Sequence, residues 1–252
     1  MSAFVSAAGI ELAYGEQGGG EAVVLVHGVA SDASGWAPVV SRVADRARVI
    51  TYDRRGYGAS QAPEDYRRTT VQEQALDAHT LVRSLDAEPA LLCGADFGAL
   101  ICLELALRSS LALSGLVLLE PAALPLVPQA TEALSAQRAK LERAMRERGP
   151  GAGVEVWLSA WNDRRAGDPE RVARAREDAG AFFADYGGLS SWPMQRRELR
   201  ALALPVHVVE GPATPPHFAA AGRALAALIP DAVTHTDGDV AGAALELVSA
   251  RR

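Results

Sequence analysis

The chain has 252 residues, of which 49% are hydrophobic and 22% are charged, so it has the composition of a globular protein with ample core material. Its formal net charge of −6, without basic residues interleaved with aromatic ones, argues against a nucleic-acid partner. The N-terminus lacks a signal-like pattern, and no stretch approaches the roughly 18 apolar residues that span a membrane. We therefore expect a cytoplasmic monomer or homodimer with no membrane partner.

The first half of the chain alternates strand-like and helix-like segments. Residues 22–26 form a continuous apolar run, as expected for a strand that is buried on both faces of a parallel sheet. Further strands are predicted at 48–52, 90–93 and 115–119, and helices at 36–44, 71–85 and 98–108. This alternation predicts βαβ units around a parallel sheet.

The alternation stops at Glu120. The next eighty or so residues contain no convincing strand, and their arginines between 164 and 176 are interspersed with acidic residues, which predicts a solvated helix face. Helices are predicted at 130–148, 152–161 and 168–185, followed by a strand at 206–210, a helix at 217–228, a strand at 232–236 and a helix at 240–250. We predict an α/β core of residues 1–120 and 204–252, with residues 121–203 inserted as a helical cap.

A Gly-x-Asp-x-Gly motif joins the strand at 90–93 to the helix that follows it. Gly94 and Gly98 flank Asp96 in the strand–turn–helix context of a nucleophile elbow, where glycines let the backbones approach closely. A carboxylate at this position attacks carbon, or moves protons, without first losing a hydroxyl proton. Alternatively, Asp96 only caps the helix, although a serine would cap equally well.

In this order and spacing, the motifs make the chain resemble the α/β-hydrolase superfamily over essentially its whole length. The matching features are His27-Gly28, the Asp-x-x-Gly-x-Gly-x-Ser pattern at 53–60, the elbow around Asp96, and the strand that ends in Gly211. The resemblance implies an eight-stranded, mostly parallel sheet flanked by helices, with a helical cap inserted after strand six. It also implies a pocket under the cap and an oxyanion hole formed by the backbone N–H groups of Val29 and Phe97.

An aspartate in the elbow resembles the epoxide hydrolase and haloalkane dehalogenase branches of the superfamily. There the carboxylate displaces an epoxide oxygen or a halide, and a histidine oriented by an acid activates water to hydrolyse the resulting ester. The family's histidine follows the last strand, but residues 238–242 of this chain contain none. The usual acid after the seventh strand is also missing, and Glu120 occupies the family's other acid position. We interpret the histidine as lost and assign the catalytic roles to Asp96 and Glu120.

Other residues are candidates for a replacement base or for the pocket lining. The possible replacement bases are His217, His235 and Asp239, although His235 is also explained as an ordinary strand residue. The expected pocket residues are His27, which in the family shapes the loop beside the oxyanion hole, and Trp36, Trp157, Trp161, Tyr186 and Trp192. Packing within the cap is the alternative for the aromatic residues. We expect neither a metal nor an organic cofactor.

These features predict an atypical enzyme of this fold that acts on a hydrophobic small molecule, for example in secondary metabolism. Without the histidine, an ester on Asp96 turns over slowly, because general-base catalysis contributes about 10²–10⁴-fold. We therefore predict that Asp96 is a general acid or base in epoxide opening, cyclisation or rearrangement. Two alternatives remain open: an epoxide-hydrolase-like enzyme with Asp96 as nucleophile and a relocated base, and a catalytically silent ligand-binding protein.

Overall fold

A mixed β-sheet forms the centre of the protein. The computed structural model describes residues 3–161, 168–188 and 192–250. Within these ranges the strands are β1 (Ala3–Ala7), β2 (Ile10–Gln17), β3 (Ala22–Val26), β4 (Arg48–Tyr52), β5 (Ala90–Ala95), β6 (Leu113–Leu119), β7 (Val206–Val209) and β8 (Val233–His235). Their order in the sheet is β1-β2-β4-β3-β5-β6-β7-β8. Strand β2 pairs antiparallel with β1 and β4, and all other neighbouring strands pair parallel, so the predicted eight-stranded, mostly parallel sheet is confirmed.

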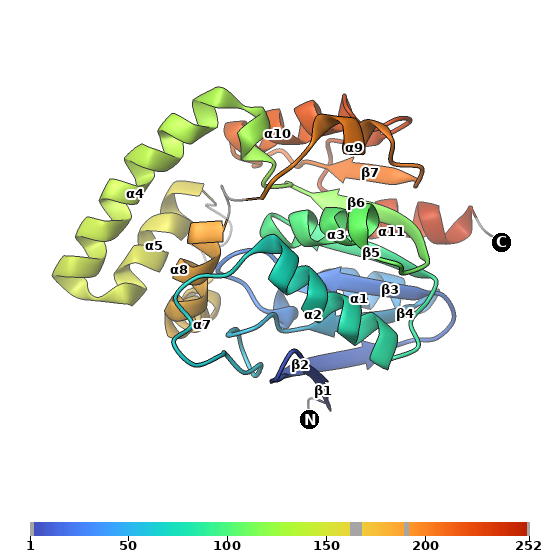
Figure 1. Ribbon diagram of the computed structural model, residues 1–252, viewed down its shortest axis with the longest axis horizontal. Coiled ribbons are helices and arrows are strands. Elements are labelled where there is room, and N and C mark those ends of the chain that lie inside the picture. Colours follow the sequence, from blue (N-terminus) through green and yellow to red (C-terminus); the bar gives the residue numbers. More distant parts are fainter. Residues whose placement is uncertain (1–2, 162–167, 189–191, 251–252) are drawn as a thin grey trace.

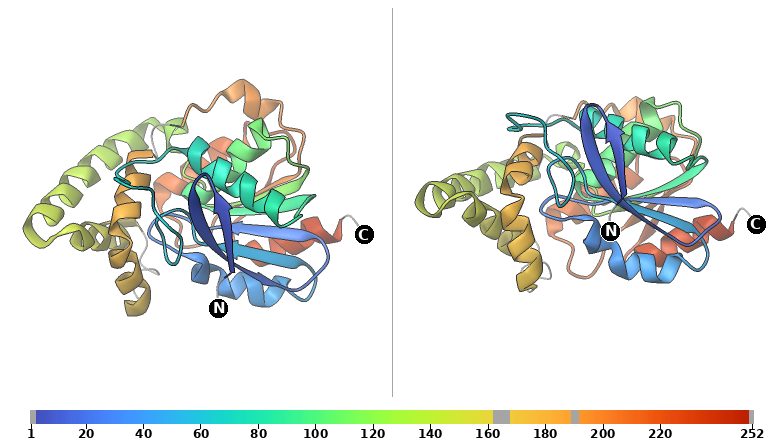
Figure 2. Two further views of the ribbon diagram at one scale, coloured as in Figure 1. Left: turned by 60° about the horizontal axis from the view of Figure 1, so that its bottom comes forward. Right: turned by 90° about the horizontal axis from the view of Figure 1, so that it is seen from below.

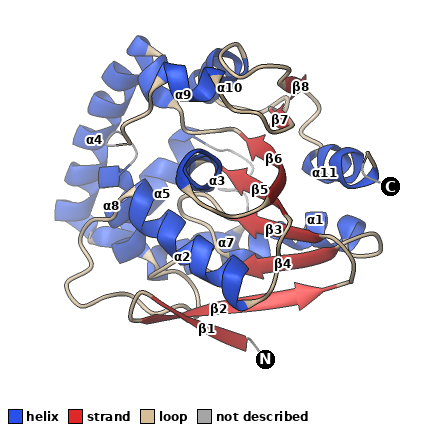
Figure 3. Cartoon of the chain, turned by 45° about the vertical axis from the view of Figure 1, so that its right-hand side comes forward, coloured by secondary structure: helices blue, strands red, loops and turns tan. Residues whose placement is uncertain are grey.

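Helices cover both faces of the sheet (Figures 1 and 3). Alternate residues of β3 point to opposite faces: Val24 joins one buried apolar cluster, whereas Val23 and Leu25 join the other. The two-sided burial explains why this strand reads as a continuous apolar run. One face packs against α2 (Val71–Ser84), α3 (Phe97–Arg108) and α10 (Pro216–Ala226), and the other against η1 (Ala33–Trp36), α1 (Ala37–Val43) and α11 (Val240–Ser249).

The regular structure described between β6 and β7 consists of helices joined by loops. Figures 1 and 2 show that its larger helices group together beside one end of the sheet. The segment comprises η2 (Leu124–Leu126), α4 (Pro128–Arg148), α5 (Pro150–Trp161), α7 (Pro169–Glu177), α8 (Ala179–Gly188) and α9 (Arg196–Arg200). We refer to residues 121–203 as the cap segment; its status as a separate domain stays a prediction. Within the described ranges, no helix has the length and apolar character needed to cross a bilayer.

The turn from β5 into α3 is strained. Asp96 has φ 54° and ψ −112°, a conformation that costs an L-residue about 1–3 kcal/mol. The glycines on either side permit this turn because a Cβ atom at Gly98 would lie 2.2 Å from the Val26 carbonyl oxygen, and one at Gly94 would lie 2.4 Å from the Gly98 carbonyl oxygen. The close approach predicted from the flanking glycines is therefore present.

We predict that Gly98→Ala lowers the free energy of unfolding by about 3 kcal/mol or more, because the added methyl group meets backbone atoms that cannot move independently. Gly180 in α8 is the matched control, since a Cβ atom there has nothing within 4 Å. Gly180→Ala should stabilise the protein by roughly 0.5–1 kcal/mol. Urea unfolding measures both changes, and an unchanged midpoint for Gly98→Ala would contradict the crowding at the elbow.

Candidate active site

Asp96 directly follows β5, at the carboxyl ends of the parallel strands, where β5 lies between β3 and β6. Its backbone N–H donates to the Leu119 carbonyl at 2.9 Å, and its own carbonyl accepts from the Ala122 N–H at 3.2 Å. The side chain is buried, and its Oδ2 accepts the backbone N–H of Val29 at 3.2 Å. Although Asp96 immediately precedes α3, its side chain makes no capping hydrogen bond to that helix. Capping therefore does not explain the aspartate.

The peptide that binds Asp96 is fixed from its opposite side. The Gly28 carbonyl accepts a hydrogen bond from Arg54 Nη2 at 3.0 Å and another from His27 Nδ1 at 2.9 Å. In a planar trans peptide the C=O and N–H bonds point in opposite directions. Two donors on the Gly28 oxygen therefore aim the Val29 N–H at the Asp96 carboxylate.

Both ring nitrogens of His27 are engaged. Its Nε2 accepts the backbone N–H of Arg54 at 2.9 Å, so the ring proton lies on Nδ1, which donates to Gly28. Burial, aided by the positive charge of Arg54, lowers the pKa of His27 well below 6.5. This histidine is neutral near pH 7 and holds the loop beside Asp96, with no nitrogen left to accept a proton from a substrate.

Arg54 is itself held by a carboxylate of the cap segment. Its guanidinium forms a bidentate ion pair with Asp185 of α8, at 2.6 and 3.1 Å, and the exposed fractions of the two side chains are 1% and 0%. Tyr57 donates to the same carboxylate at 2.7 Å and Gln74 at 2.8 Å. The Arg54 guanidinium also lies 5.1 Å from the centre of the Phe97 ring. One buried ion pair thus joins the cap segment to the loop that orients the Val29 N–H.

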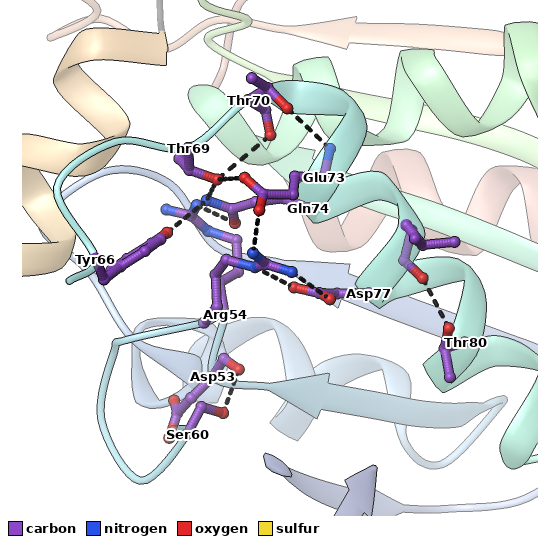
Figure 4. A network of polar contacts seen from close by, with 12 residues as sticks. Asp53, Arg54, Ser60, Tyr66, Thr69, Thr70, Glu73, Gln74, Asp77 and Thr80 are labelled. Carbon is purple, nitrogen blue, oxygen red and sulfur yellow. Dashed lines mark hydrogen bonds and ion pairs between the residues drawn. The ribbon is translucent and has the colours of Figure 1, made fainter. Parts of the chain in front are cut away.

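Helix α2 supplies the second wall of this network. Figure 4 shows Gln74 and Asp77 pointing from α2 towards the loop that follows β4. Gln74 Oε1 accepts from Arg54 Nη1 at 2.7 Å, and Asp77 binds Arg55 through two hydrogen bonds of 2.6 and 2.8 Å. Consecutive arginines therefore have separate buried acceptors, which fix the loop conformation on two sides.

A pocket of about 200 Å³ lies at the strand ends next to Asp96. Asp96 is not among its described lining residues, but its neighbours Ala95 and Gly28 are. Glu120 lines the pocket and accepts a 2.7 Å hydrogen bond from the Thr214 hydroxyl. The lining comprises His27, Gly28, Ser31, Gly35, Trp36, Ala95, Leu119, Glu120, Arg171, Gly211, Ala213 and Gly238.

Arg171 of α7 differs from the solvated face predicted for the arginines of this region. It is half-buried, lines the pocket, and donates to the Ser31 hydroxyl at 3.0 Å. Its neighbour Arg174 pairs with Asp32 of the core at 2.9 Å. The prediction of a solvated face was wrong for Arg171, because α7 packs against the loop after β3, whereas Arg174 is exposed as predicted although it forms this pair. Arg164 and Arg165 lie outside the described residues.

A second, larger pocket lies within the cap segment. Its volume is about 420 Å³, and its lining is mostly apolar, with Leu124, Leu141 and Phe183 among its members. Tyr186 lines this cavity, and its hydroxyl donates to the Leu134 carbonyl at 3.0 Å. The cap segment therefore encloses space for an apolar group separate from the polar pocket beside Asp96.

The structure distributes the expected pocket aromatics over several places. Trp36 lies at the polar pocket with His27, and Tyr186 at the apolar one. Trp157 is buried against the rings of Phe182 and Tyr186. Trp192 is also buried, and its indole N–H donates to Glu104 at 2.7 Å. The side chain of Trp161 lies outside the described residues.

The three candidate replacement bases are not among the described residues that line the polar pocket. His235 forms a 3.0 Å hydrogen bond with His207. Asp239 caps the N-terminus of α11, where it accepts from the Gly242 N–H at 2.9 Å, and it forms a bidentate pair with Arg42, which lowers its pKa. His217 is half-buried at the start of α10. Of the five histidines, all within described ranges, His27 alone lines this pocket.

The phenylalanine after Asp96 begins α3, so its N–H belongs to the first helical turn, whose N–H groups have no acceptor within the helix. The N–H groups of Val29 and Phe97 are the pair that the resemblance implied for an oxyanion hole.

Sequence reasoning missed Arg54, Asp185, Arg171 and Thr214. The one available signal was the pair of consecutive arginines in the loop at 53–60.

A model described as the alpha/beta hydrolase family matches residues 23–242, which is most of the chain. The protein belongs to the alpha/beta hydrolase family. The thermophilic esterase from Thermogutta terrifontis has 25% sequence identity and a TM-score of 0.75, covering 100% of this chain and 97% of the esterase. The enol-lactonase from Burkholderia xenovorans LB400 has 23% sequence identity and a TM-score of 0.78, covering 98% of this chain and 100% of the lactonase. At this identity the similarity supports the fold alone.

Curated relatives in the alpha/beta hydrolase family match over shorter segments. The uncharacterized hydrolase YraK of Bacillus subtilis (strain 168) is 34% identical over 100 residues, 40% of this chain and 37% of the relative. The epoxide hydrolase of Caballeronia sordidicola is 37% identical over 92 residues, 36% of this chain and 28% of the relative. These alignments span 37% and 28% of the two relatives, so they support membership of a hydrolase family and not a specific reaction.

We predict that Asp185→Asn lowers the free energy of unfolding by about 3–5 kcal/mol, because it leaves the buried Arg54 charge without its carboxylate. Asp65→Asn is the control: Asp65 pairs with Arg67 at 3.9 Å, with side chains 91% and 86% exposed, and its loss should leave the urea midpoint unchanged. Similar midpoints for the two variants would contradict the role assigned to the buried pair.

We also predict that His27 contributes to acid destabilisation. Its pKa is lowered on folding, so the unfolded chain binds the extra proton, and stability is lost as the pH falls below about 6.5, by at most about 1.4 kcal/mol per pH unit. His27→Gln should therefore flatten the pH dependence of the unfolding free energy between pH 7 and 5. His79→Gln, on α2, should keep the wild-type slope. Equal slopes for His27→Gln and the wild type would refute this prediction.

Proposed function

We propose that this hydrolase-family protein is an enzyme in which Asp96 acts as a general acid/base on a hydrophobic small molecule. The observation that carries the proposal is the Asp96 carboxylate, buried at the strand ends with its Oδ2 on the Val29 N–H. The histidine beside it, His27, uses both ring nitrogens for other hydrogen bonds. A carboxylate without an adjacent free imidazole suits proton transfer better than the hydrolysis of an ester.

In the proposed reaction, Asp96 acts first as the base. Asp96 takes a proton from water, or from a hydroxyl group of the substrate, as that oxygen attacks an epoxide carbon. The epoxide C–O bond breaks, and the guanidinium of Arg171 stabilises the negative charge on the departing oxygen. Asp96 returns the proton to that oxygen, which gives a diol from water or a cyclic ether from an internal hydroxyl.

Two further features support this assignment. Glu120, held by Thr214, supplies a second carboxylate at the pocket, where it orients the attacking hydroxyl or water. The apolar cavity of about 420 Å³ in the cap segment matches a hydrophobic substrate in chemical character. No cofactor takes part in these steps.

A second candidate is an epoxide-hydrolase-like reaction with Asp96 as the nucleophile. The specific observation in its favour is that the Val29 N–H contacts Oδ2, the atom that becomes the ester carbonyl oxygen when Oδ1 attacks carbon. The epoxide hydrolase relatives agree with this chemistry. It requires a base that activates water, and His217, His235 and Asp239, the candidates from the sequence, are not among the described residues that line the polar pocket.

A single turnover in ¹⁸O-labelled water separates the two reactions, with a panel of hydrophobic aryl and alkyl epoxides as substrates. In the general-base reaction with water, the diol carries ¹⁸O and the protein does not. In the nucleophilic reaction, the first product oxygen comes from Asp96, and ¹⁸O enters the protein or a stable adduct accumulates. Mass spectrometry of the product and of the intact protein measures both. Label in the Asp96 carboxylate would overturn the general-base proposal.

We predict that Asp96→Asn lowers kcat/KM at least about 100-fold, because an amide neither accepts the proton nor attacks carbon. The control is again Asp65→Asn, which changes the same atoms at an exposed site and should retain wild-type activity. Product formation by Asp96→Asn at the wild-type rate would contradict both enzymatic reactions. Tight ligand binding without product in any variant would identify a catalytically silent binding protein.

A further inference from the structure

Two histidines and a glutamate meet at the edge of the sheet on the α11 face. Val209 of β7 belongs to the apolar cluster under α11, and His207, two residues earlier on the same strand, points the same way. His235 pairs in register with Val209 from the neighbouring strand β8, so its side chain shares this face. Glu246 on α11 lies over the two imidazoles. Among described residues, this is the group whose His, Cys, Asp or Glu atoms converge as metal ligands do.

The distances between the three donor atoms match those around a small divalent ion. His207 Nδ1 and His235 Nε2 lie 3.0 Å apart, and Glu246 Oε2 lies 3.7 Å from the first and 3.9 Å from the second. Ligands bound tetrahedrally at the usual zinc distances of about 2.0–2.1 Å are separated from one another by roughly 3.4 Å. The observed separations bracket this value, so small side-chain adjustments bring all three atoms into a coordination sphere.

We propose that His207, His235 and Glu246 bind one divalent transition-metal ion, with Zn²⁺ the best match. Two imidazoles and one carboxylate are a donor set that zinc accepts, whereas Mg²⁺ and Ca²⁺ prefer oxygen ligands. Three protein ligands leave a fourth position for water. Because the Glu246 side chain is 61% exposed, the ion enters directly from solvent.

The protonation state of the imidazoles agrees with this donor set. Two neutral imidazoles that face each other share one N–H···N hydrogen bond, so one of the facing nitrogens must carry a proton. A metal ion replaces that proton and uses both lone pairs. Burial, together with the neighbouring His235, lowers the pKa of His207 and keeps it in the neutral form that binds metals.

The site joins elements at the edge of the sheet. Strand β8 has only three residues and lies at the edge of the sheet, with Val233 exposed. An ion held by His207, His235 and Glu246 connects β7, β8 and α11. This role is independent of the reaction at Asp96, and neither facing histidine is among the described residues that line the polar pocket.

Zn²⁺ binding to the full chain, measured by isothermal titration calorimetry, tests the proposal. We expect one Zn²⁺ per wild-type chain, and at least about tenfold weaker binding in His235→Gln and Glu246→Gln, since even the loss of an outer-shell partner costs about 10–100-fold. Glu246 is exposed, so its variant folds even where a histidine variant does not. Co²⁺ should give visible absorption bands in the wild type that both variants lose.

His79→Gln is the matched control, because it removes a histidine from α2 and should bind Zn²⁺ as the wild type does. Hydrogen exchange supplies a second measurement: Zn²⁺ should slow exchange in β8 and α11 of the wild type but not of Glu246→Gln. No Zn²⁺ binding by the wild type would overturn the proposal. So would unchanged affinity in Glu246→Gln and His235→Gln, or an equal loss in His79→Gln.

Discussion

The buried ion pair between Arg54 and Asp185 is the contact on which the rest of the site depends. Taking two charges out of water is costly, and the cost is offset only when each charge is fully hydrogen-bonded. Here Gln74 and Tyr57 donate further hydrogen bonds to the Asp185 carboxylate, and the Arg54 guanidinium donates one to the Gly28 carbonyl. One guanidinium therefore fixes the cap segment, the loop after β4 and the peptide that contacts the elbow carboxylate.

The site consequently obtains its geometry from backbone groups more than from side chains. The strained conformation of Asp96 persists because both of its backbone groups are hydrogen-bonded. Its N–H donates to Leu119 of strand β6, and its carbonyl accepts from the Ala122 N–H. The Val29 N–H is aimed from behind by donors on the preceding carbonyl. A preorganised backbone donor needs no rearrangement when charge develops in a reaction, and this is the main advantage of the fold as a scaffold for catalysis.

The parts predicted from the sequence are those encoded by local patterns. The apolar run of β3 and the glycines around Asp96 each carry their own physical reason within a few residues. The Arg54–Asp185 pair joins residues 131 positions apart, and no periodicity connects them. The charge pattern around Arg171 is typical of an exposed helix. Its place at the pocket follows from the packing of α7 against the core, which the sequence pattern does not encode. Thr214 lies after the seventh strand, where the family's usual acid is missing, and its hydroxyl donates to Glu120.

Asp185 belongs to α8, so this helix is anchored to the core by charge as well as by packing. Moving α8 away from the core separates this pair and also breaks the hydrogen bonds that Tyr57 and Gln74 donate to Asp185. Opening of the cap segment at α8 therefore requires the whole network to break. Helix α4 packs on α5 and η2 and has no part in the Arg54 network. A shift of α4 would therefore leave the Arg54–Asp185 pair intact, whereas a shift of α8 would not.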